Sequence, residues 1–108
     1  MLTISSARQN NSLVISLSGR IDAASAKDLE QQCLAWISEG HTHLVFDFSD
    51  VSYISSAALR VFLLAAKRVE PAQGSVRLCA MNATLRDVFD ISGFSKLFMI
   101  TATVAEAL

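Results

Sequence analysis

The stretch HLVFDFSDVSYISSAALRVFLLAAKR, residues 43–68, joins two apolar runs through a polar connection. The run at 43–48 is short and mostly apolar, with consecutive apolar residues at 44–46, which is typical of a strand buried on both faces. The second run begins after Ser55 and Ser56, has apolar residues at helical spacing, and is interrupted only by Arg60. A buried strand that leads into an apolar helix indicates an α/β fold.

The flanking segments extend this alternation in both directions. Leu13, Ile15 and Leu17 alternate with Val14 and two serines, a pattern that predicts a half-buried strand ending near Gly19. Further strands are predicted at 2–8, 76–81 and 97–101, and helices at 26–37, at 83–92 and after Thr103. The order β-β-α-β-α-β-α-β-α predicts a mixed sheet of about four to five strands with right-handed crossovers.

Two local patterns at helix ends can be tested directly. Ser25 with Asp28 three residues later has the spacing of a capping box, so we expect Ser25 to cap the first helix. In the helix at 83–92, Leu85, Val88 and Phe89 form an apolar stripe, to which Ile91 is added as its last member.

Composition narrows the possible functions. The 108 residues are 52% hydrophobic and 18% charged, enough for one folded domain over residues 1–108. A net charge of -1 argues against binding nucleic acid. The longest apolar run, 61–66, is too short to insert in a membrane, and no secretion signal is visible. We interpret Cys33 and Cys79 as free buried thiols and expect a cytoplasmic protein.

Polar residues follow several predicted strands, where α/β folds place their sites. These residues are Asp22, the segment 47–56 and the segment 81–84. The histidines and cysteines lack zinc-ligand spacing, and no glycine-rich phosphate loop is present, so we expect neither a metal nor a cofactor.

The serine pair has one hydroxyl more than a helix start requires. One serine is explained as the helix cap, and we assign this role to Ser55 and the switch to Ser56. A nucleophilic serine is disfavoured, because the only possible bases, His41 and His43, precede a strand and belong at its far end. A phosphoacceptor serine fits better, since a helix start offers free N–H groups and the positive end of the dipole. Arg60, four residues after Ser56, is a candidate contact for that phosphate.

The helix after the serines is apolar on more than one side. Leu59, Phe62, Leu63 and Ala66 form one stripe, which leaves Val61, Leu64 and Ala65 on other faces. Either neighbouring helices cover these flanks, or an exposed patch beside the serines forms an interface.

Four segments together resemble the STAS-domain anti-sigma factor antagonists of bacteria: SLSGRIDAASAKDLE, LVFDFSDVSYISSAALRVFLLAAKR, GSVRLCAMNATLRDVFDISGFSKLF and the closing EAL. The resemblance covers nearly the whole chain. It implies a STAS fold, with helices packed mainly on one face of the mixed sheet. It also implies a non-enzymatic protein that binds a serine-kinase anti-sigma factor, is switched off when that kinase phosphorylates it, and is restored by a PP2C-type phosphatase.

The family motif places the phosphoacceptor at Ser56, with Ser55 as second choice. The expected partner-binding surface consists of residues that match the family pattern, namely Asp22, Ser55, Ser56, Ala57, Ala58 and Leu59, together with Arg60 and Phe62, which helical spacing adds. Ser55 stands where the best-studied branch has aspartate. Ala58 stands where glycine is usual, and its methyl group is expected to limit the approach of a kinase backbone.

Other STAS domains suggest alternatives. A constitutive scaffold or a subunit of a lipid-transport assembly would use Ser55 as a cap and leave Ser56 without a role. A partner-switching assembly in secretion or motility would keep the kinase without a dedicated sigma factor.

Overall fold

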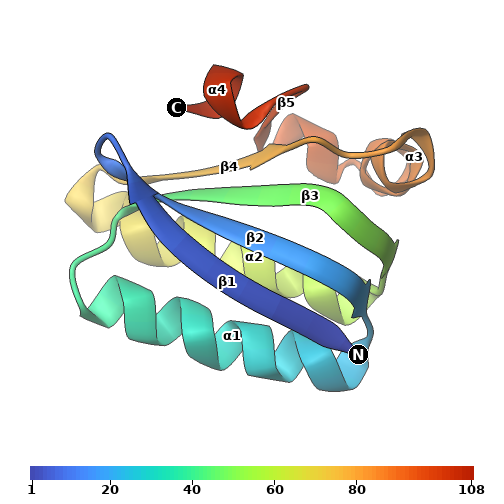
Figure 1. Ribbon diagram of the computed structural model, residues 1–108, viewed down its shortest axis with the longest axis horizontal. Coiled ribbons are helices and arrows are strands. Elements are labelled where there is room, and N and C mark those ends of the chain that lie inside the picture. Colours follow the sequence, from blue (N-terminus) through green and yellow to red (C-terminus); the bar gives the residue numbers. More distant parts are fainter.

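A five-stranded mixed sheet organises the chain (Figure 1). The computed structural model describes residues 1–108. The elements are β1 (Leu2–Gln9), β2 (Ser12–Ile21), α1 (Ala23–Ser38), β3 (His43–Ile54), α2 (Ser56–Val69), β4 (Ser75–Cys79), α3 (Ala83–Ile91), β5 (Met99–Thr101) and α4 (Val104–Ala107), with short 3-10 turns at Glu70–Ala72 and Phe94–Lys96. The strands are ordered β1-β2-β3-β4-β5; β1 is antiparallel to β2, and the other neighbours are parallel. The predicted order and the mixed sheet are confirmed.

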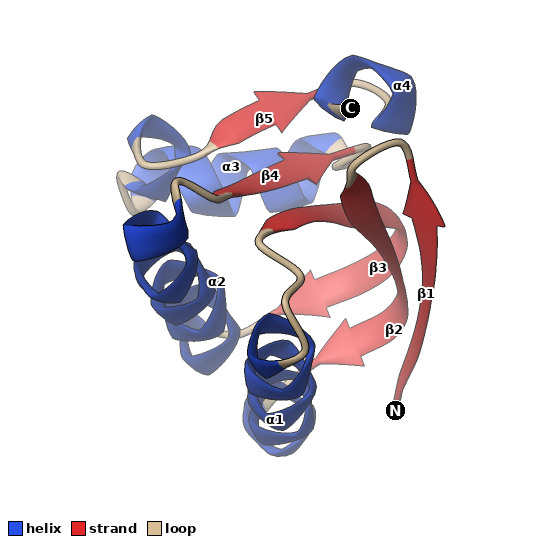
Figure 2. Ribbon diagram, turned by 90° about the vertical axis from the view of Figure 1, so that its left-hand side faces the viewer, coloured by secondary structure: helices blue, strands red, loops and turns tan.

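The helices lie mainly on one face of the sheet, as predicted. In Figure 2, α1 and α2 lie side by side against this face. Together with α3 they contribute to a main core cluster of 23 buried residues. The short α4 covers the opposite face, where Ala107 packs with Val14, Val45 and Cys79. Both faces of the central strands are therefore buried, which explains the consecutive apolar residues 44–46 in β3.

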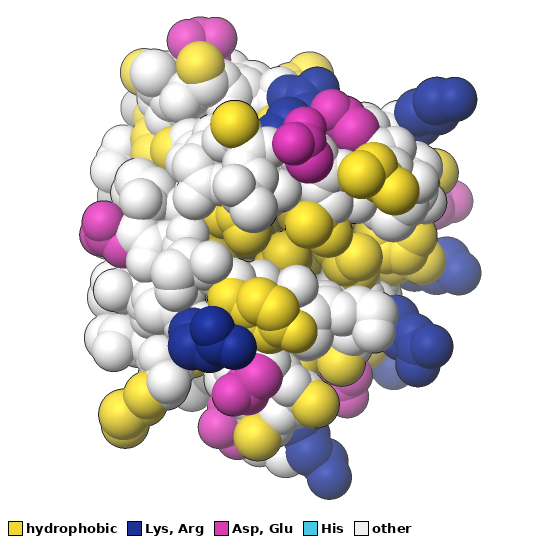
Figure 3. Space-filling model, turned by 90° about the vertical axis from the view of Figure 1, so that its right-hand side faces the viewer, with side chains coloured by type: hydrophobic (Ala, Val, Ile, Leu, Met, Phe, Trp, Pro, Cys, Tyr) yellow, Lys and Arg dark blue, Asp and Glu magenta, His cyan; other side chains and the backbone are white.

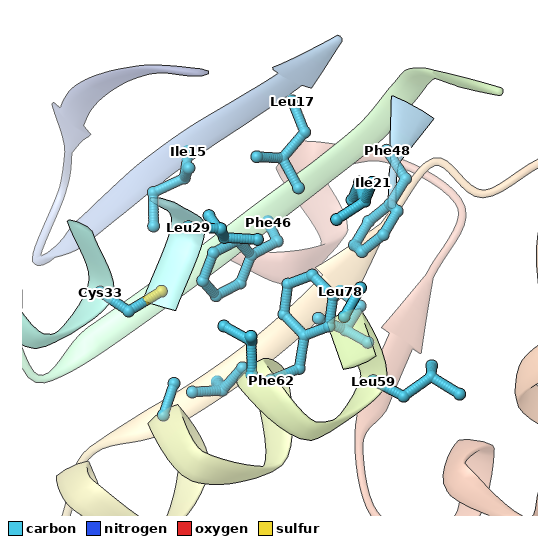
Figure 4. Close-up of a cluster of buried hydrophobic side chains, with 14 of the residues drawn as sticks. Ile15, Leu17, Ile21, Leu29, Cys33, Phe46, Phe48, Leu59, Phe62 and Leu78 are labelled. Carbon is cyan, nitrogen blue, oxygen red and sulfur yellow. The ribbon is translucent and has the colours of Figure 1, made fainter. Parts of the chain in front are cut away.

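Phenylalanine side chains tie the main core together (Figure 4). The Phe62 ring of α2 lies 4.9 Å from the Phe46 ring and 5.3 Å from the Phe48 ring, both on β3. Phe48 in turn lies 6.1 Å from Phe89 on α3. Edge-on and tilted aromatic contacts of this kind add to the stabilisation from burial. They fix α2 and α3 relative to the strand that precedes the serine pair.

Two strands are longer than the sequence indicated. β2 continues past Gly19 to Ile21, and β3 continues past Phe48 to Ile54. Their pairing register shifts twice, between Ser16 and Ser18 and again between Gly19 and Arg20. Each irregularity adds a residue to β3 and breaks the alternation of apolar and polar residues. The segment after Phe48 therefore looked like a connection although it is a strand.

Two other predictions concern single residues. Ile91 does not belong to the stripe of α3: its side chain is 87% exposed at the last position of the helix, while Leu85 and Phe89 are buried. Cys33 and Cys79 are free and buried, as expected. Burial raises the pKa of Cys33 to about 12 and that of Cys79 to about 11, so both thiols are protonated near neutral pH.

No helix in the structure has both the length and the apolar character needed to cross a membrane.

Gly74 allows the chain entering β4 to pass close to the chain entering β3. The Ser75 N–H donates to the Thr42 carbonyl at 2.8 Å, and a Cβ atom on Gly74 would overlap that same carbonyl oxygen. Gly74→Ala should therefore lower the free energy of unfolding by about 1–3 kcal/mol, measured by chemical denaturation. The exposed change Ala72→Ser should alter it by less than about 0.5 kcal/mol. Equal stability of Gly74→Ala and wild type would contradict this packing.

Candidate functional site

The starts of α1 and α2 lie at the same edge of the sheet. β2 and β3 run parallel until Ile21 stands opposite Ile54. One residue further, the Ser55 N–H donates to the Ile21 carbonyl at 2.9 Å. Asp22 follows Ile21 directly, so this hydrogen bond brings the cap residues of both helices together. In Figure 1 this edge is at the right, near the N-terminus.

Asp22 is the N-cap of α1. The prediction that Ser25 caps this helix is therefore wrong. The Ser25 N–H donates to Asp22 Oδ1 at 2.9 Å, and the Asp22 N–H donates to Ser25 Oγ at 2.9 Å. The capping box is therefore formed by Asp22 and Ser25, three residues before the predicted pair. The hydrogen bonds from the backbone and hydroxyl of Ser25 lower the pKa of Asp22 below its usual value of 3.8.

The two serines have different environments. Ser55 has an extended backbone and is the N-cap of α2, with its Oγ accepting from the Ala58 N–H at 3.3 Å. This confirms Ser55 as the capping serine. Ser56 is the first residue of α2; it is exposed, and its hydroxyl makes no hydrogen bond to the protein. Ser55 therefore supplies the cap of α2, and the hydroxyl of Ser56, which has no role in capping, faces solvent.

Several residues of the expected partner surface are buried instead. Ala58 and Phe62 have no exposed surface, and Leu59 is 6% exposed, all within the main core. Their side chains cannot contact a partner directly in this structure. The Ala58 methyl group also cannot obstruct an approaching kinase, because it points into the core. Ala57 is half-buried and Arg60 is exposed, so these two remain at the surface with Ser56.

The apolar flank of α2 is covered by α1. Val61 and Ala65 are 3% and 1% exposed, and α1 packs along this side of α2. Of the two explanations offered by the sequence, coverage by a neighbouring helix is therefore correct for these residues.

A shallow groove remains between the N-terminal halves of α1 and α2. It has a volume of about 300 Å³ and is lined by the apolar residues Ala23, Ala26, Ala57 and Val61 and by Glu30. Lys27 and Arg60 stand on its two sides. Arg60 is thus one turn beyond Ser56 at the rim of this groove.

Arg20 and Tyr53 form a second exposed feature beside the caps. They are opposite each other in the β2–β3 pairing, and the Arg20 guanidinium lies 4.3 Å from the centre of the Tyr53 ring. The sequence did not reveal this pair, because the bulges hide the register that joins the two residues. Figure 3 views this end of the molecule: hydrophobic side chains form a band across the middle, Asp and Glu side chains lie above and below it, and Lys and Arg side chains project at the right-hand rim and also lie beside the band.

Other predicted residues lie elsewhere. β4 ends at Cys79, opposite Asp47, while β3 continues to Ile54, so the segment 81–84 does not reach the serine pair. Asp47 accepts from the Ser49 N–H at 2.9 Å and supports the irregular course of β3. His43 begins β3 and lies at the opposite end of the strand from Ser55, as expected. No three His, Cys, Asp or Glu side chains come together as a metal site requires.

The fold and this site define a class: a small α/β domain with a mixed sheet, whose candidate site is a solvent-facing helix start rather than an enclosed cavity. The chain belongs to the STAS domain family, whose model matches residues 3–107.

The relatives and solved structures agree with this assignment. BtrV of Bordetella bronchiseptica, a protein named as an anti-sigma factor antagonist, is 40% identical over 82% of this chain and 76% of its own. The anti-sigma-B factor antagonist of Bacillus subtilis is 32% identical over 88% of this chain and 87% of its own. The crystal structure of an anti-sigma factor antagonist from Mycobacterium paratuberculosis, 25% identical, superposes with a TM-score of 0.89 over 99% of this chain and 91% of that one.

The different environments of the serines predict different effects on stability. Ser55→Ala removes the cap of α2 and should lower the free energy of unfolding by about 1 kcal/mol. Ser56→Ala is the matched control and should change it by less than about 0.5 kcal/mol, because that hydroxyl has no partner. Thermal or chemical unfolding of the two variants tests this, and a larger loss for Ser56→Ala would contradict the assignment.

The lowered pKa of Asp22 predicts that the free energy of unfolding depends on pH in the acidic range. Its pKa is lower in the folded state, so its contribution to stability is complete above the unfolded pKa near 3.8 and is lost as the pH falls through the folded pKa. Asp22→Asn keeps a capping oxygen but does not titrate. The unfolding free energy of this variant should therefore fall less steeply than that of wild type below about pH 4. Parallel curves for the two proteins would show that Asp22 does not contribute.

Proposed function

We propose that this chain, acting as one STAS domain over residues 1–108, is an anti-sigma factor antagonist controlled by phosphorylation of Ser56. It binds a serine-kinase anti-sigma factor and thereby releases the sigma factor. Phosphorylation by that kinase ends the binding, and a PP2C-type phosphatase restores it. In this proposal the protein is a cytoplasmic binding protein and not an enzyme, and its partner supplies the ATP.

The observation that carries the proposal is the exposed, unbonded hydroxyl of Ser56 at the first position of a helix. Ser55 already caps α2, so modification of Ser56 removes no hydrogen bond from the fold. The names of the relatives supply the partner class, because BtrV and the Bacillus subtilis protein are both named as anti-sigma factor antagonists.

A phosphate on Ser56 would stabilise the start of α2 rather than disrupt it. No acidic side chain lies in the first turn of α2, so the positive end of its dipole is not balanced there. Arg60, one turn further, is exposed and forms no ion pair with an acidic side chain. The added charge of about -1.5 to -2 would therefore leave the fold intact and change only the surface that a partner meets.

The partner surface that fits the structure is smaller than the one expected from the sequence. It retains Asp22, Ser55, Ser56, Ala57 and Arg60, which are exposed or half-buried at the starts of α1 and α2. Ala58, Leu59 and Phe62 support this surface from the core instead of forming it.

The proposal is tested with an anti-sigma kinase recovered by pull-down with the wild-type protein and then purified. Incubation with this kinase and ATP should place one phosphate on Ser56, mapped by mass spectrometry. In calorimetric titrations, Ser56→Asp should bind the kinase at least tenfold more weakly, while Ser56→Ala should bind like wild type and remain bound in the presence of ATP.

Ser6→Asp provides the matched charge control, since Ser6 is exposed on the edge strand β1. It should bind the kinase like wild type. Phosphate on a residue other than Ser56 would contradict the site. Equal binding by Ser56→Asp and wild type would contradict the switch and favour a constitutive STAS scaffold.

A further inference from the structure

We infer that two copies of this chain associate through β1, so that the sheet continues from one copy into the other. β1 is an edge strand of eight residues, and Figure 2 shows it at the right-hand side of the sheet, with β2 as its one neighbouring strand. An uncovered edge strand presents N–H and C=O groups that can pair with another strand. This surface goes beyond the proposed switch, because it does not depend on Ser56.

Every second residue of β1 directs its backbone groups away from β2. The Arg20 N–H donates to the Met1 carbonyl at 3.4 Å, which makes these two residues a hydrogen-bonded pair of the antiparallel ladder. Bonded and non-bonded pairs alternate along such a ladder. The outward-facing N–H and C=O groups are therefore those of Leu2, Ile4, Ser6 and Arg8. The pairing with β2 has no register shift, so no bulge protects this edge.

A second copy fits this edge in an antiparallel register centred on Ser5. In this register the outward-facing groups of Leu2 pair with those of Arg8 in the second copy. Ile4 pairs with Ser6 of the second copy in the same way. Arg8 is the one charged residue of β1, so the register places no two like charges opposite each other. The strand is therefore compatible with pairing to itself about a twofold axis.

A shallow pocket beside β1 can receive the Arg8 side chain of the second copy. It has a volume of about 260 Å³ and is lined by Leu2 and Ile4 of β1 and by residues of α1, among them Asp28. Leu2 and Ile4 pack against the main core, on the helix face of the sheet. Arg8 lies on the same face, because side chains alternate along a strand. Pairing with Leu2 therefore places Arg8 of the second copy beside this pocket.

The charge at this pocket that remains available is that of Asp28. Asp22 also lines the pocket, but its carboxylate is engaged, since hydrogen bonds from Ser25 and the positive charge of the Met1 amino group lower its pKa. Asp28 is exposed and has no ion pair within the chain. The pocket therefore keeps one negative charge for a cation of a second molecule.

Arg8 and Asp28 are complementary charges that one chain cannot bring together. Arg8 also has no ion pair. It lies at the hairpin end of β1, whereas Asp28 lies in the second turn of α1, beside the start of β1. Antiparallel pairing of two copies brings Arg8 of each copy to Asp28 of the other. The twofold axis thus gives two charge-assisted contacts in addition to the backbone hydrogen bonds.

Sedimentation equilibrium of the full chain from about 10 µM to 1 mM tests the association and should show a reversible dimer, as a small interface allows. Hydrogen exchange followed by NMR locates the interface. The amides of Ile4, Ser6 and Arg8 should exchange more slowly at high concentration. Those of Thr3 and Ser5, which bond to β2, should be protected throughout. A monomer at every concentration, or a dimer in which the outward amides exchange at unchanged rates, would overturn the proposal.

Two charge reversals test the contact between Arg8 and Asp28. Arg8→Glu and Asp28→Arg should each weaken the dimer by about tenfold or more, because each brings like charges together at both contacts. An equimolar mixture of the two variants should form a dimer again, since opposite charges then meet at both contacts. Arg68→Glu reverses a charge at an exposed position on α2 and should dimerise like wild type. Failure of the mixture to recover the dimer, or equal weakening by Arg68→Glu, would contradict this pairing.

Discussion

The parallel pairing of β2 and β3 is the constraint on which the candidate site depends. It holds through two irregularities and ends with the hydrogen bond from the Ser55 N–H to the Ile21 carbonyl. Both following helices start at the next residues, so their N-termini must share one edge of the sheet. Without the two extra residues of β3, the register would shift and the starts of α1 and α2 would no longer meet.

The same pairing determines which part of α2 a partner can reach. Since α2 packs through Phe62 on β3 and through Val61 and Ala65 against α1, most of its apolar surface is buried inside the domain. The solvent-facing part of its first turns is limited to Ser56, Ala57 and Arg60. A helix that looks like an interface in the sequence is therefore mainly a core element with a small exposed start.

The sequence predicted the order of elements, the mixed sheet and the capping role of Ser55, because these follow from local periodicity and turn residues. It did not distinguish Asp22 from Ser25 as the cap of α1, since Asp22–Ser25 and Ser25–Asp28 have the same spacing. The end of β2 decides between them, and that end depends on tertiary pairing. The length of β3 and the Arg20–Tyr53 contact were also missed, because both depend on a strand register that the bulges conceal. The burial of Ala58 was missed because it depends on which face of α2 packs on the core.

The distribution of charge at this edge explains how a modification could act without a change of shape. Asp22 places a carboxylate at the start of α1, while α2 has a neutral cap and no acid in its first turn. A phosphate on Ser56 would give α2 the negative charge that its dipole favours, and would add it beside the existing charge of Asp22. The domain would then be as stable as before or more so, but its partner would meet two neighbouring negative groups instead of one. In the proposed switch the added charge therefore acts on the surface that the partner meets and not on a hydrogen bond of the fold.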